Sequence, residues 1–293
     1  MRERFLTYLT TEKRASAHTL DAYNTDLKQF EMFVSEIYDL EGIQSATSNM
    51  IRSWVVQLKD HGISARSINR KLTSLRSYYG FLQKTNPGTD NPAAKINSLK
   101  SKKQLPVFIP QESMQKLLEN EGSGLGFSEL RDYLIIEVLY QTGMRRAELV
   151  QLKEKDIDFG RSVFKVSGKR NKQRFVPFHS KLSLALNAYL EAKHNKYGTA
   201  VPALIVSDKG RPATADLIYR IVNSYLKQFT SLTKTSPHVL RHTFATHLLN
   251  NGASLIAIRD LLGHSNLAAT EIYTHNSIEQ LKKIHEQAHP KGH

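Results

Sequence analysis

Residues 236–273 read SPHVLRHTFATHLLNNGASLIAIRDLLGHSNLAATEIY, and the pattern of this stretch predicts two consecutive helices. Ser236 before Pro237 is typical of a helix start, with the serine at the N-cap and the proline at the first helical position. The apolar residues of 254–262 predict the second helix, and Gly263 is a natural stop because glycine tolerates the left-handed backbone of a helix end. We therefore expect helices over 237–251 and 254–262.

The polar residues of this stretch suit chemistry on a phosphodiester. His238 falls in the first turn of its helix, where free backbone N–H groups and the helix dipole favour an anion. Arg241 lies three residues further on, on the same face, and a guanidinium grips phosphate oxygens. His264 follows Gly263, and Tyr273 is one of twelve tyrosines. Each has an ordinary alternative, since His-x-x-Arg pairs are common on surfaces and a histidine after a helix is usually structural.

The composition is that of a globular protein that meets a polyanion. The 293 residues are enough for two domains, and 41 Lys and Arg against 27 Asp and Glu give a net charge of +14. A charge of this size favours nucleic acid as the partner, although a merely basic surface is the alternative. Cysteine is absent, which excludes disulfides and thiol chemistry and fits a reducing cytoplasm. Neither an apolar run of membrane-spanning length nor an apolar signal core at the N-terminus occurs, so we expect a cytoplasmic protein.

The first 84 residues are expected to be helical throughout. Apolar residues recur at helical spacing over 19–33 and again over 67–82. The polar side of the second helix carries four cations that we expect to face a phosphate backbone, with a simply solvated face as the alternative: Arg66, Arg70, Lys71 and Arg76. Turn signals and lysines over 85–106 then predict a basic linker, whose Lys102 and Lys103 we also expect to contact DNA.

The rest of the chain is expected to be mainly helical, with a small antiparallel sheet. Pro110 begins one helix, and an apolar helix over 130–141 ends at Gly143. Two short strands over 156–164 and 173–177 flank a turn that carries Lys169 at its tip. Further helices are predicted over 180–196, 214–230 and 277–287. Arg145 and Arg146 follow the 130–141 helix, where they could simply complement its dipole.

Five motifs occur together and in order: TLDAYNTDLKQF from Thr19, TGMRRAEL from Thr142, SGKRNKQRFVP from Ser167, PHVLRHTFATHLLNNG from Pro237 and LLGHSNLAATEIYTH from Leu261. Over nearly its whole length the chain resembles the tyrosine site-specific recombinases of the phage-integrase superfamily, and closely the bacterial Xer proteins. The resemblance implies an N-terminal helical, SAM-like core-DNA-binding domain over 1–84, a basic linker over 85–106 and a catalytic domain over 107–287. Together these are expected to form a C-shaped clamp on double-stranded DNA.

The resemblance also implies a catalytic set. By position, Arg145 and Arg241 are the arginine pair, Lys169 is the hairpin lysine, and Tyr273 is the nucleophile. His238 and His264 are the two histidines of the set. Tyr273 is expected to attack a DNA phosphate, leaving a 3′-phosphotyrosyl link and a free 5′-hydroxyl, with no metal, ATP or other cofactor. Two departures from the usual pattern are Arg146-Ala147 and Arg170, where glycine is usual; Arg170 is expected to alter how the hairpin meets DNA.

The expected role is resolution of chromosome or plasmid dimers at cell division, by a nucleoid-associated tetramer of identical or related subunits. The resemblance further implies docking of the 277–287 helix on a neighbouring subunit, with packing on its own domain as the alternative, and a DNA translocase at the division septum as a partner. The competing functions are a mobile-element integrase, a tyrosine-type topoisomerase and a DNA-binding protein without catalysis. A metallohydrolase could use His238 and His242, but it lacks the His-Glu-x-x-His motif and an evident carboxylate partner.

Overall fold

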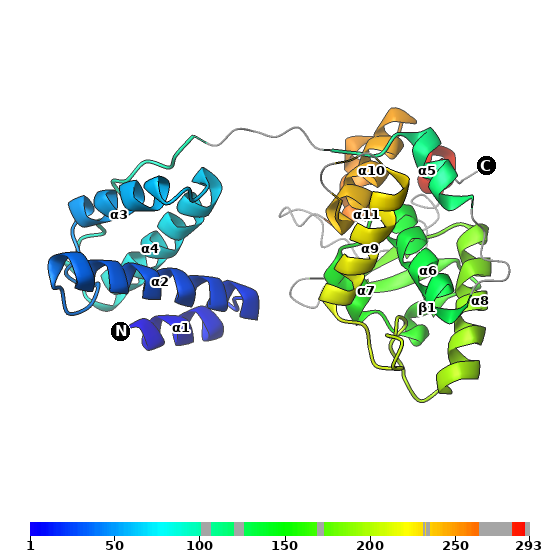
Figure 1. Cartoon of the computed structure of the whole chain (residues 1–293), viewed down its shortest axis with the longest axis horizontal. Helices are drawn as coiled ribbons and strands as arrows, with labels where there is room; N and C mark the ends of the chain where they lie inside the picture. Colours follow the sequence, from blue (N-terminus) through cyan, green and yellow to red (C-terminus); the bar gives the residue numbers. More distant parts are fainter. Residues whose placement is uncertain are drawn as a thin grey trace. The chain divides into compact units, whose positions relative to one another are not determined.

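The computed structural model describes residues 1–100, 107–119, 126–168, 173–230, 232, 235–263 and 283–290. The chain forms two compact units, Met1–Gln104 and Leu105–His293 (Figure 1). Most of the ordered structure is helical, and a three-stranded antiparallel sheet lies in the second unit, which confirms the predicted fold class. Within the described ranges, the helices are too short or too polar to cross a lipid bilayer.

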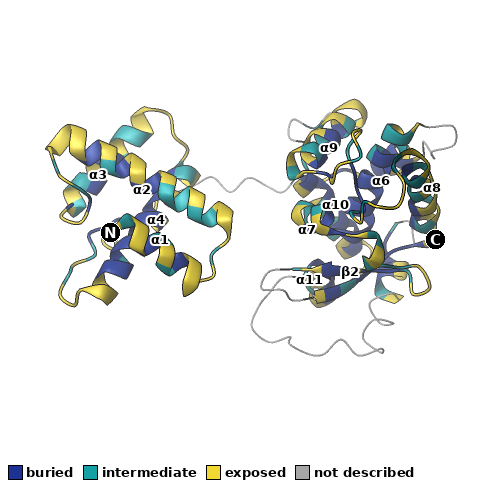
Figure 2. Cartoon of the chain, turned by 90° about the horizontal axis from the view of Figure 1, so that it is seen from below, coloured by how far each residue is buried: buried dark blue, intermediate teal, exposed yellow. Residues whose placement is uncertain are grey.

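The first unit is a bundle of helices around an aromatic core. Serine or threonine N-caps, each accepting from the backbone N–H three residues on, begin three of them. Phe30 and Trp54 lie 4.9 Å apart between ring centroids, and the buried Tyr79 hydroxyl donates to the Ile43 carbonyl at 2.6 Å. Figure 2 shows the buried residues along one side of each helix. The helices are α1 (Arg2–Thr11), α2 (Ala17–Tyr38), α3 (Ser48–Asp60) and α4 (Ala65–Thr85).

A buried carboxylate joins α2 to α4. Asp26 on α2 has no exposed surface, and it accepts hydrogen bonds from three side chains of α4. The Ser74 hydroxyl donates at 2.7 Å, the Lys71 ammonium lies at 3.1 Å, and Arg70 forms an ion pair with the same carboxylate. Because a buried charge is tolerated only when it is paired and hydrogen-bonded, these contacts fix the register of the two helices.

The segment after α4 packs on the first unit as far as Leu99. Ala93 and Ile96 are buried in its core, although both belong to the stretch expected to be a linker. Asn69 on α4 donates to the Leu99 carbonyl at 2.9 Å and accepts from the Leu99 N–H at 2.8 Å. Arg76 donates to the carbonyls of Ala93 and Ile96. We call residues 91–99 the strap.

The second unit is built around α6 (Phe127–Thr142). Residues 133–142 are all buried, so the helix needs cover on every side, which α8 (Ser180–Tyr197), α9 (Ala215–Phe229) and α10 (Pro237–Asn250) provide (Figure 1). Gly143 ends α6 in the left-handed conformation at φ 57°, as predicted. The remaining helices are α5 (Gln111–Leu118), α7 (Arg146–Gln151), the 3₁₀ helix η1 (Glu154–Asp156) and α11 (Leu255–Leu262).

The sheet has the order β1-β2-β3, with antiparallel neighbours. The predicted strand over 156–164 is wrong in extent, because Ser162 adopts a left-handed φ of 51° and turns the chain between β1 (Ile157–Asp158) and β2 (Val163–Ser167). The predicted strand over 173–177 is confirmed as β3 (Gln173–Pro177). Pairing of Ser167 with Gln173 brings the ends of β2 and β3 together.

The C-terminal helix, over 283–288 in the described residues, packs on its own unit. Ile284 contacts the cluster formed by α10 and α11. The His285 ring donates from Nε2 to the Gln141 carbonyl at 2.6 Å, and Asn251 donates to the Ala288 carbonyl at 2.7 Å. Within one chain, this segment therefore packs on its own domain, which was the alternative to docking on a neighbouring subunit. Residues 277–282 of the predicted helix, with Ile278 and Leu281, lie outside the described residues.

Candidate active site

The turn between α6 and α7 brings the motif that begins at Thr142 against α10. Gly143 has a left-handed backbone, and a Cβ there would lie 2.4 Å from Cδ1 of Phe244 on α10. A side chain is therefore excluded by both conformation and space. Arg145 follows as the N-cap of α7, a helix that the sequence pattern did not predict. The close approach at Gly143 places Arg145 beside the start of α10, the helix that carries His238 and Arg241.

Arg241 joins the ends of two helices. Its guanidinium donates to the Gly143 carbonyl at 2.6 Å and to the Leu262 carbonyl at 2.8 Å, at the C-terminal ends of α6 and α11. A cation is favoured there because carbonyl groups at helix ends carry partial negative charge. Burial, and then the positive charge of Arg145, lower the pKa of Arg241 to about 10, so it remains charged at neutral pH.

Arg145, at the start of α7, also donates to the C-terminal end of α11. One of its guanidinium nitrogens donates to Glu148 at 3.0 Å, and another donates to the Gly263 carbonyl at 3.4 Å. The carbonyls of Leu262 and Gly263 are consecutive, so the two guanidinium groups are held at one turn although their residues are far apart in the chain. The Arg145 side chain is 38% exposed, which leaves it accessible to an anion from solvent.

His238 lies at the solvent-facing start of α10, as predicted. Ser236 is the N-cap and Pro237 the first helical residue, although the serine side chain makes no capping hydrogen bond. The pKa of His238 is lowered, first by partial burial and then by the charges of a neighbouring histidine and three arginines: His242, Arg146, Arg241 and Arg145. The ring is therefore neutral at pH 7 and able to accept a proton.

Sequence analysis did not identify two buried residues of this site, Glu148 and Arg174. Glu148 accepts from both terminal nitrogens of Arg174 at 2.9 Å each, and from the Arg145 backbone N–H at 2.7 Å. Burial raises the pKa of Glu148, but the hydrogen bonds and charge of Arg174, and then those of Arg145, hold it below its usual value. An acid three residues after a helix N-cap is a capping-box signal, and it could have identified Glu148 had α7 been predicted.

The structure thus brings together Arg145, His238 and Arg241 of the expected catalytic set. The other three members, Lys169, His264 and Tyr273, lie outside the described residues, as do Arg170, Lys102 and Lys103 of the expected DNA contacts. In sequence, Lys169 falls between the paired ends of β2 and β3, and His264 directly follows the turn that holds both arginines. No group of three or more metal-ligating side chains is found in the described part of the chain.

The four cations expected to face DNA from α4 have different surroundings. Arg66 is exposed, and Arg70 is 46% exposed while pairing with Asp26. Lys71 is buried against Asp26 and Gln29, so its ammonium joins α2 to α4 instead of facing solvent. Arg76 donates hydrogen bonds to backbone carbonyls of the strap. On this helix, Arg66 and Arg70 are therefore the cations of the four best placed to meet an anion.

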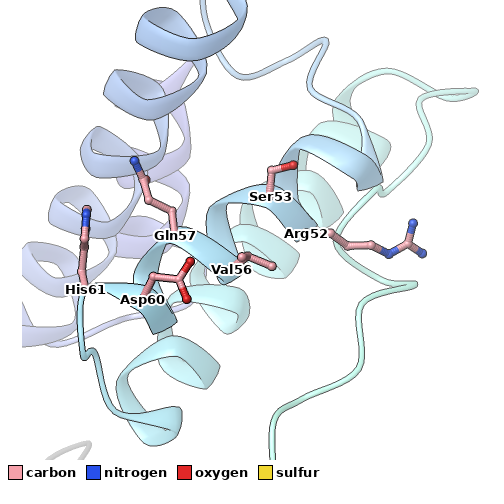
Figure 3. A pocket seen from close by; sticks show the side chains of 6 residues that line it. All are labelled: Arg52, Ser53, Val56, Gln57, Asp60 and His61. Atoms are coloured by element: carbon pink, nitrogen blue, oxygen red, sulfur yellow. The ribbon is translucent and has the colours of Figure 1, made fainter.

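A shallow hollow lies along α3 of the first unit. Figure 3 shows the side chains that line it, and both charge signs are present: Arg52, Ser53, Val56, Gln57, Asp60 and His61. Arg52 is already bonded to the Asn49 side chain at 2.9 Å. The hollow carries no convergent set of cations comparable with the turn that holds Arg145 and Arg241.

Comparison with known proteins identifies the family of the chain. Residues 107–280 match the phage integrase family, and residues 3–86 match the phage integrase N-terminal SAM-like domain. The chain is 36% identical over 296 residues to tyrosine recombinase XerC of Staphylococcus saprophyticus subsp. saprophyticus, covering 100% of this chain and 98% of the relative. It is 35% identical over 295 residues to tyrosine recombinase XerC of Listeria innocua serovar 6a, with the same two coverages.

Solved structures share the fold. The XerH site-specific recombinase bound to its palindromic difH substrate, a post-cleavage complex, has a TM-score of 0.71 and 21% identity over 97% of this chain and 83% of that one. The Tn1549 transposon integrase bound to transposon right end DNA has a TM-score of 0.69 and 20% identity, over 96% of this chain and 93% of that one. With the family match extending over more than half of its length and the XerC relatives aligned along all of it, the chain belongs to the phage integrase family and is a tyrosine recombinase of the Xer type.

Proposed function

We propose that the enzyme recombines a specific double-stranded DNA site through a 3′-phosphotyrosyl intermediate, and that it resolves chromosome or plasmid dimers. One observation carries the chemical part: Arg145 and Arg241 are held at a single turn, with the neutral ring of His238 beside them. Two guanidinium groups and a proton acceptor suit a phosphodiester whose negative charge grows during the reaction. The full-length similarity to XerC proteins supports the biological part.

In the proposed reaction, the Tyr273 hydroxyl oxygen attacks phosphorus as the bond to the 5′-oxygen breaks. The phenolic proton passes to His238, since an ordinary tyrosine has a pKa of about 10 and needs a base at neutral pH. Lys169 donates a proton to the leaving 5′-oxygen. The nonbridging oxygens are stabilised by three donors, namely Arg145, Arg241 and His264.

The second half of the reaction reverses the first on a partner strand. The 5′-hydroxyl of that strand attacks the phosphotyrosine, and the tyrosine leaves as a phenol. Each step exchanges one phosphate ester for another, so the bond energy is conserved in the covalent link. The exchange needs no nucleotide hydrolysis, and the proposed proton transfers use only side chains of this chain.

The proposed assembly is a tetramer of identical or related subunits on paired DNA sites at the nucleoid, with a septal DNA translocase as a further partner. The free chain keeps residues 283–288 on its own catalytic unit, so exchange of that helix between neighbours requires its release. Light scattering on the protein with its DNA tests this: complexes of four protomers on two sites support the tetramer, and complexes that never exceed one or two protomers contradict it.

The nucleophile provides the direct test of the reaction. We expect the wild-type protein, mixed with sheared genomic DNA of its host, to become covalently attached to a defined sequence, which can be recovered and sequenced. The variant Tyr273→Phe should bind that sequence without forming an adduct on a denaturing gel. Tyr38→Phe, at an exposed tyrosine of the first unit, is the matched control and should react normally. An adduct formed by Tyr273→Phe would overturn the assignment.

A further inference from the structure

Arg174 is a buried arginine whose hydrogen bonds, within the described residues, go to Glu148 and Leu261 at the candidate active site. It is the second residue of β3, and its side chain is 7% exposed. Both terminal nitrogens donate to Glu148 at 2.9 Å, and Nε donates to the Leu261 carbonyl at 3.3 Å. A Cβ on Gly263 would lie 3.0 Å from the Arg174 guanidinium carbon, so the glycine lets the turn rest directly on this group.

These contacts connect three of the segments that carry proposed catalytic residues. Glu148 links Arg174 to Arg145 at the start of α7. Leu261 and Gly263 belong to the end of α11, to which Arg145 also donates, and from which the chain continues to His264. Strand β3 itself follows the loop that bears Lys169 in the sequence.

We propose that Arg174 is a positioning residue for the transesterification: it holds Glu148 so that the carboxylate orients Arg145, and it holds the end of α11 against the same point. The inference rests on the proposed function, because the residues it positions are the proposed donors to the phosphate. Arg174 does not contact the phosphate itself, since its fork of donors is directed to Glu148 and Leu261.

The charges explain why an arginine is required. Glu148 is buried beside Arg145, and Arg174 supplies it with two parallel charge-assisted bonds. Without Arg174, the carboxylate has Arg145 as its one remaining ion pair among the described residues, and it would draw the Arg145 guanidinium into a tighter pairing. Donors of Arg145 would then be turned toward Glu148 and away from the phosphate. A lysine restores the charge but has a single nitrogen. It cannot donate to both carboxylate oxygens and to the Leu261 carbonyl in the planar arrangement that the guanidinium allows.

The test separates positioning from DNA binding. Two variants, Arg174→Met and Arg174→Lys, are compared with wild type on a nicked duplex of the sequence that the wild-type protein traps. The Kd is measured by fluorescence anisotropy, and the first-order rate constant of adduct formation is measured at saturating protein. Arg161→Met is the matched control, because Arg161 lies at the β1–β2 turn and is 51% exposed in a long ion pair with Asp158.

We expect Arg174→Met to form the adduct about 10²-fold more slowly, the cost typical of losing one oriented transition-state donor, with Kd within about threefold of wild type. Arg174→Lys should fall between the two, and Arg161→Met should match wild type. Wild-type rate constants in both Arg174 variants, or a loss that appears only in Kd, would overturn the proposal.

Thermal unfolding shows whether Arg174→Met is folded. If it is not, the Kd and the rate constant of adduct formation of the folded Arg174→Lys variant test the proposal. Failure of this inference differs from failure of the proposed function. Wild-type protein that forms no adduct through Tyr273 would refute the function, whereas normal wild-type chemistry with unaffected Arg174 variants would refute only the role of Arg174.

Discussion

At the scale of single residues, the candidate site depends on arginines oriented by backbone carbonyls. Arg241 spans the ends of α6 and α11 through two carbonyl contacts, which hold the plane of its guanidinium. A planar group with several donors can keep these contacts while presenting other N–H groups to a phosphate. Two carbonyl contacts therefore do not use all five N–H donors of the Arg241 guanidinium.

Replacing Arg241 should slow the chemical step more than it weakens binding. We expect Arg241→Ala to form the covalent adduct about 10²–10³-fold more slowly at saturating protein, as found when one transition-state donor is removed. Single-turnover adduct formation measures the effect, with Arg220→Ala on α9 as control because that arginine is 69% exposed. Near-normal adduct formation by Arg241→Ala would remove Arg241 from the active site.

Sequence analysis named the residues that we propose to meet the phosphate, but it did not name those that support them. His238 and Arg241 share a helix face, a local relation that spacing reveals, and family position supplied Arg145. The pairing of Glu148 with Arg174 joins residues 26 apart through the fold, and no local pattern predicts it. The burial of Lys71 was missed for the same reason, because its partner Asp26 lies on another helix.

At the scale of elements, sequence patterns predicted the long helices, whereas one short helix was missed and one short strand was predicted with the wrong extent. Helix α7 has six residues, fewer than two turns, so its apolar spacing carries little information. The strand expected over 156–164 is interrupted at Ser162, whose left-handed backbone is rare for a residue other than glycine. Helix ends marked by Gly143 and Gly263 were predicted correctly, because a left-handed C-cap has a distinct residue preference.

A stack of histidines attaches the C-terminal helix to its own unit. The rings of His179 and His285 lie 4.4 Å apart between centroids, and those of His285 and His289 lie 5.0 Å apart. Burial, and then the charge of His179, lower the pKa of His285 to about 3, and burial also lowers that of His289. His247 packs nearby against Tyr140, with its own pKa lowered by burial. The docked helix therefore favours neutral imidazoles.

Acidification should loosen this helix. A released histidine has a pKa of about 6.5, above the docked value, so the docked state keeps its full stability above pH 6.5 and loses it as the pH falls toward 3. Each histidine that protonates only on release costs the docked state about 1.4 kcal/mol per pH unit below 6.5. We expect amide exchange over 283–289, corrected for its intrinsic pH dependence, to be faster at pH 5 than at pH 7.5.

His179→Phe provides the control, because it keeps an aromatic ring in the stack and removes the charge of His179 that lowers the pKa values of His285 and His289. Its exchange over 283–289 should depend less steeply on pH than that of the wild type. Corrected exchange that is equal at the two pH values in the wild type would show that protonation of the stack does not govern docking.

At the scale of the whole molecule, the net charge of +14 should make DNA binding strongly dependent on salt. Binding that neutralises six or more phosphates loses about 10³-fold in affinity or more between 50 and 200 mM salt. Titrations by anisotropy over this range give the slope of log K against log salt. Arg66→Gln, at an exposed cation of α4, should reduce the slope by about one. A flat dependence would argue against extensive phosphate contacts.

The strap sets the reach of the connection between the two units. Leu99 is fixed to α4 through Asn69, and Ile109 is fixed to α10 through Thr243 and His247. The chain advances ten residues between these anchors, which limits their separation to about 35 Å even when fully extended. Once one unit holds DNA, so short a tether keeps the other at an effective concentration on the order of millimolar. Two units that each bind DNA weakly can then bind it tightly together, and either unit can dissociate briefly while the chain stays on its DNA site.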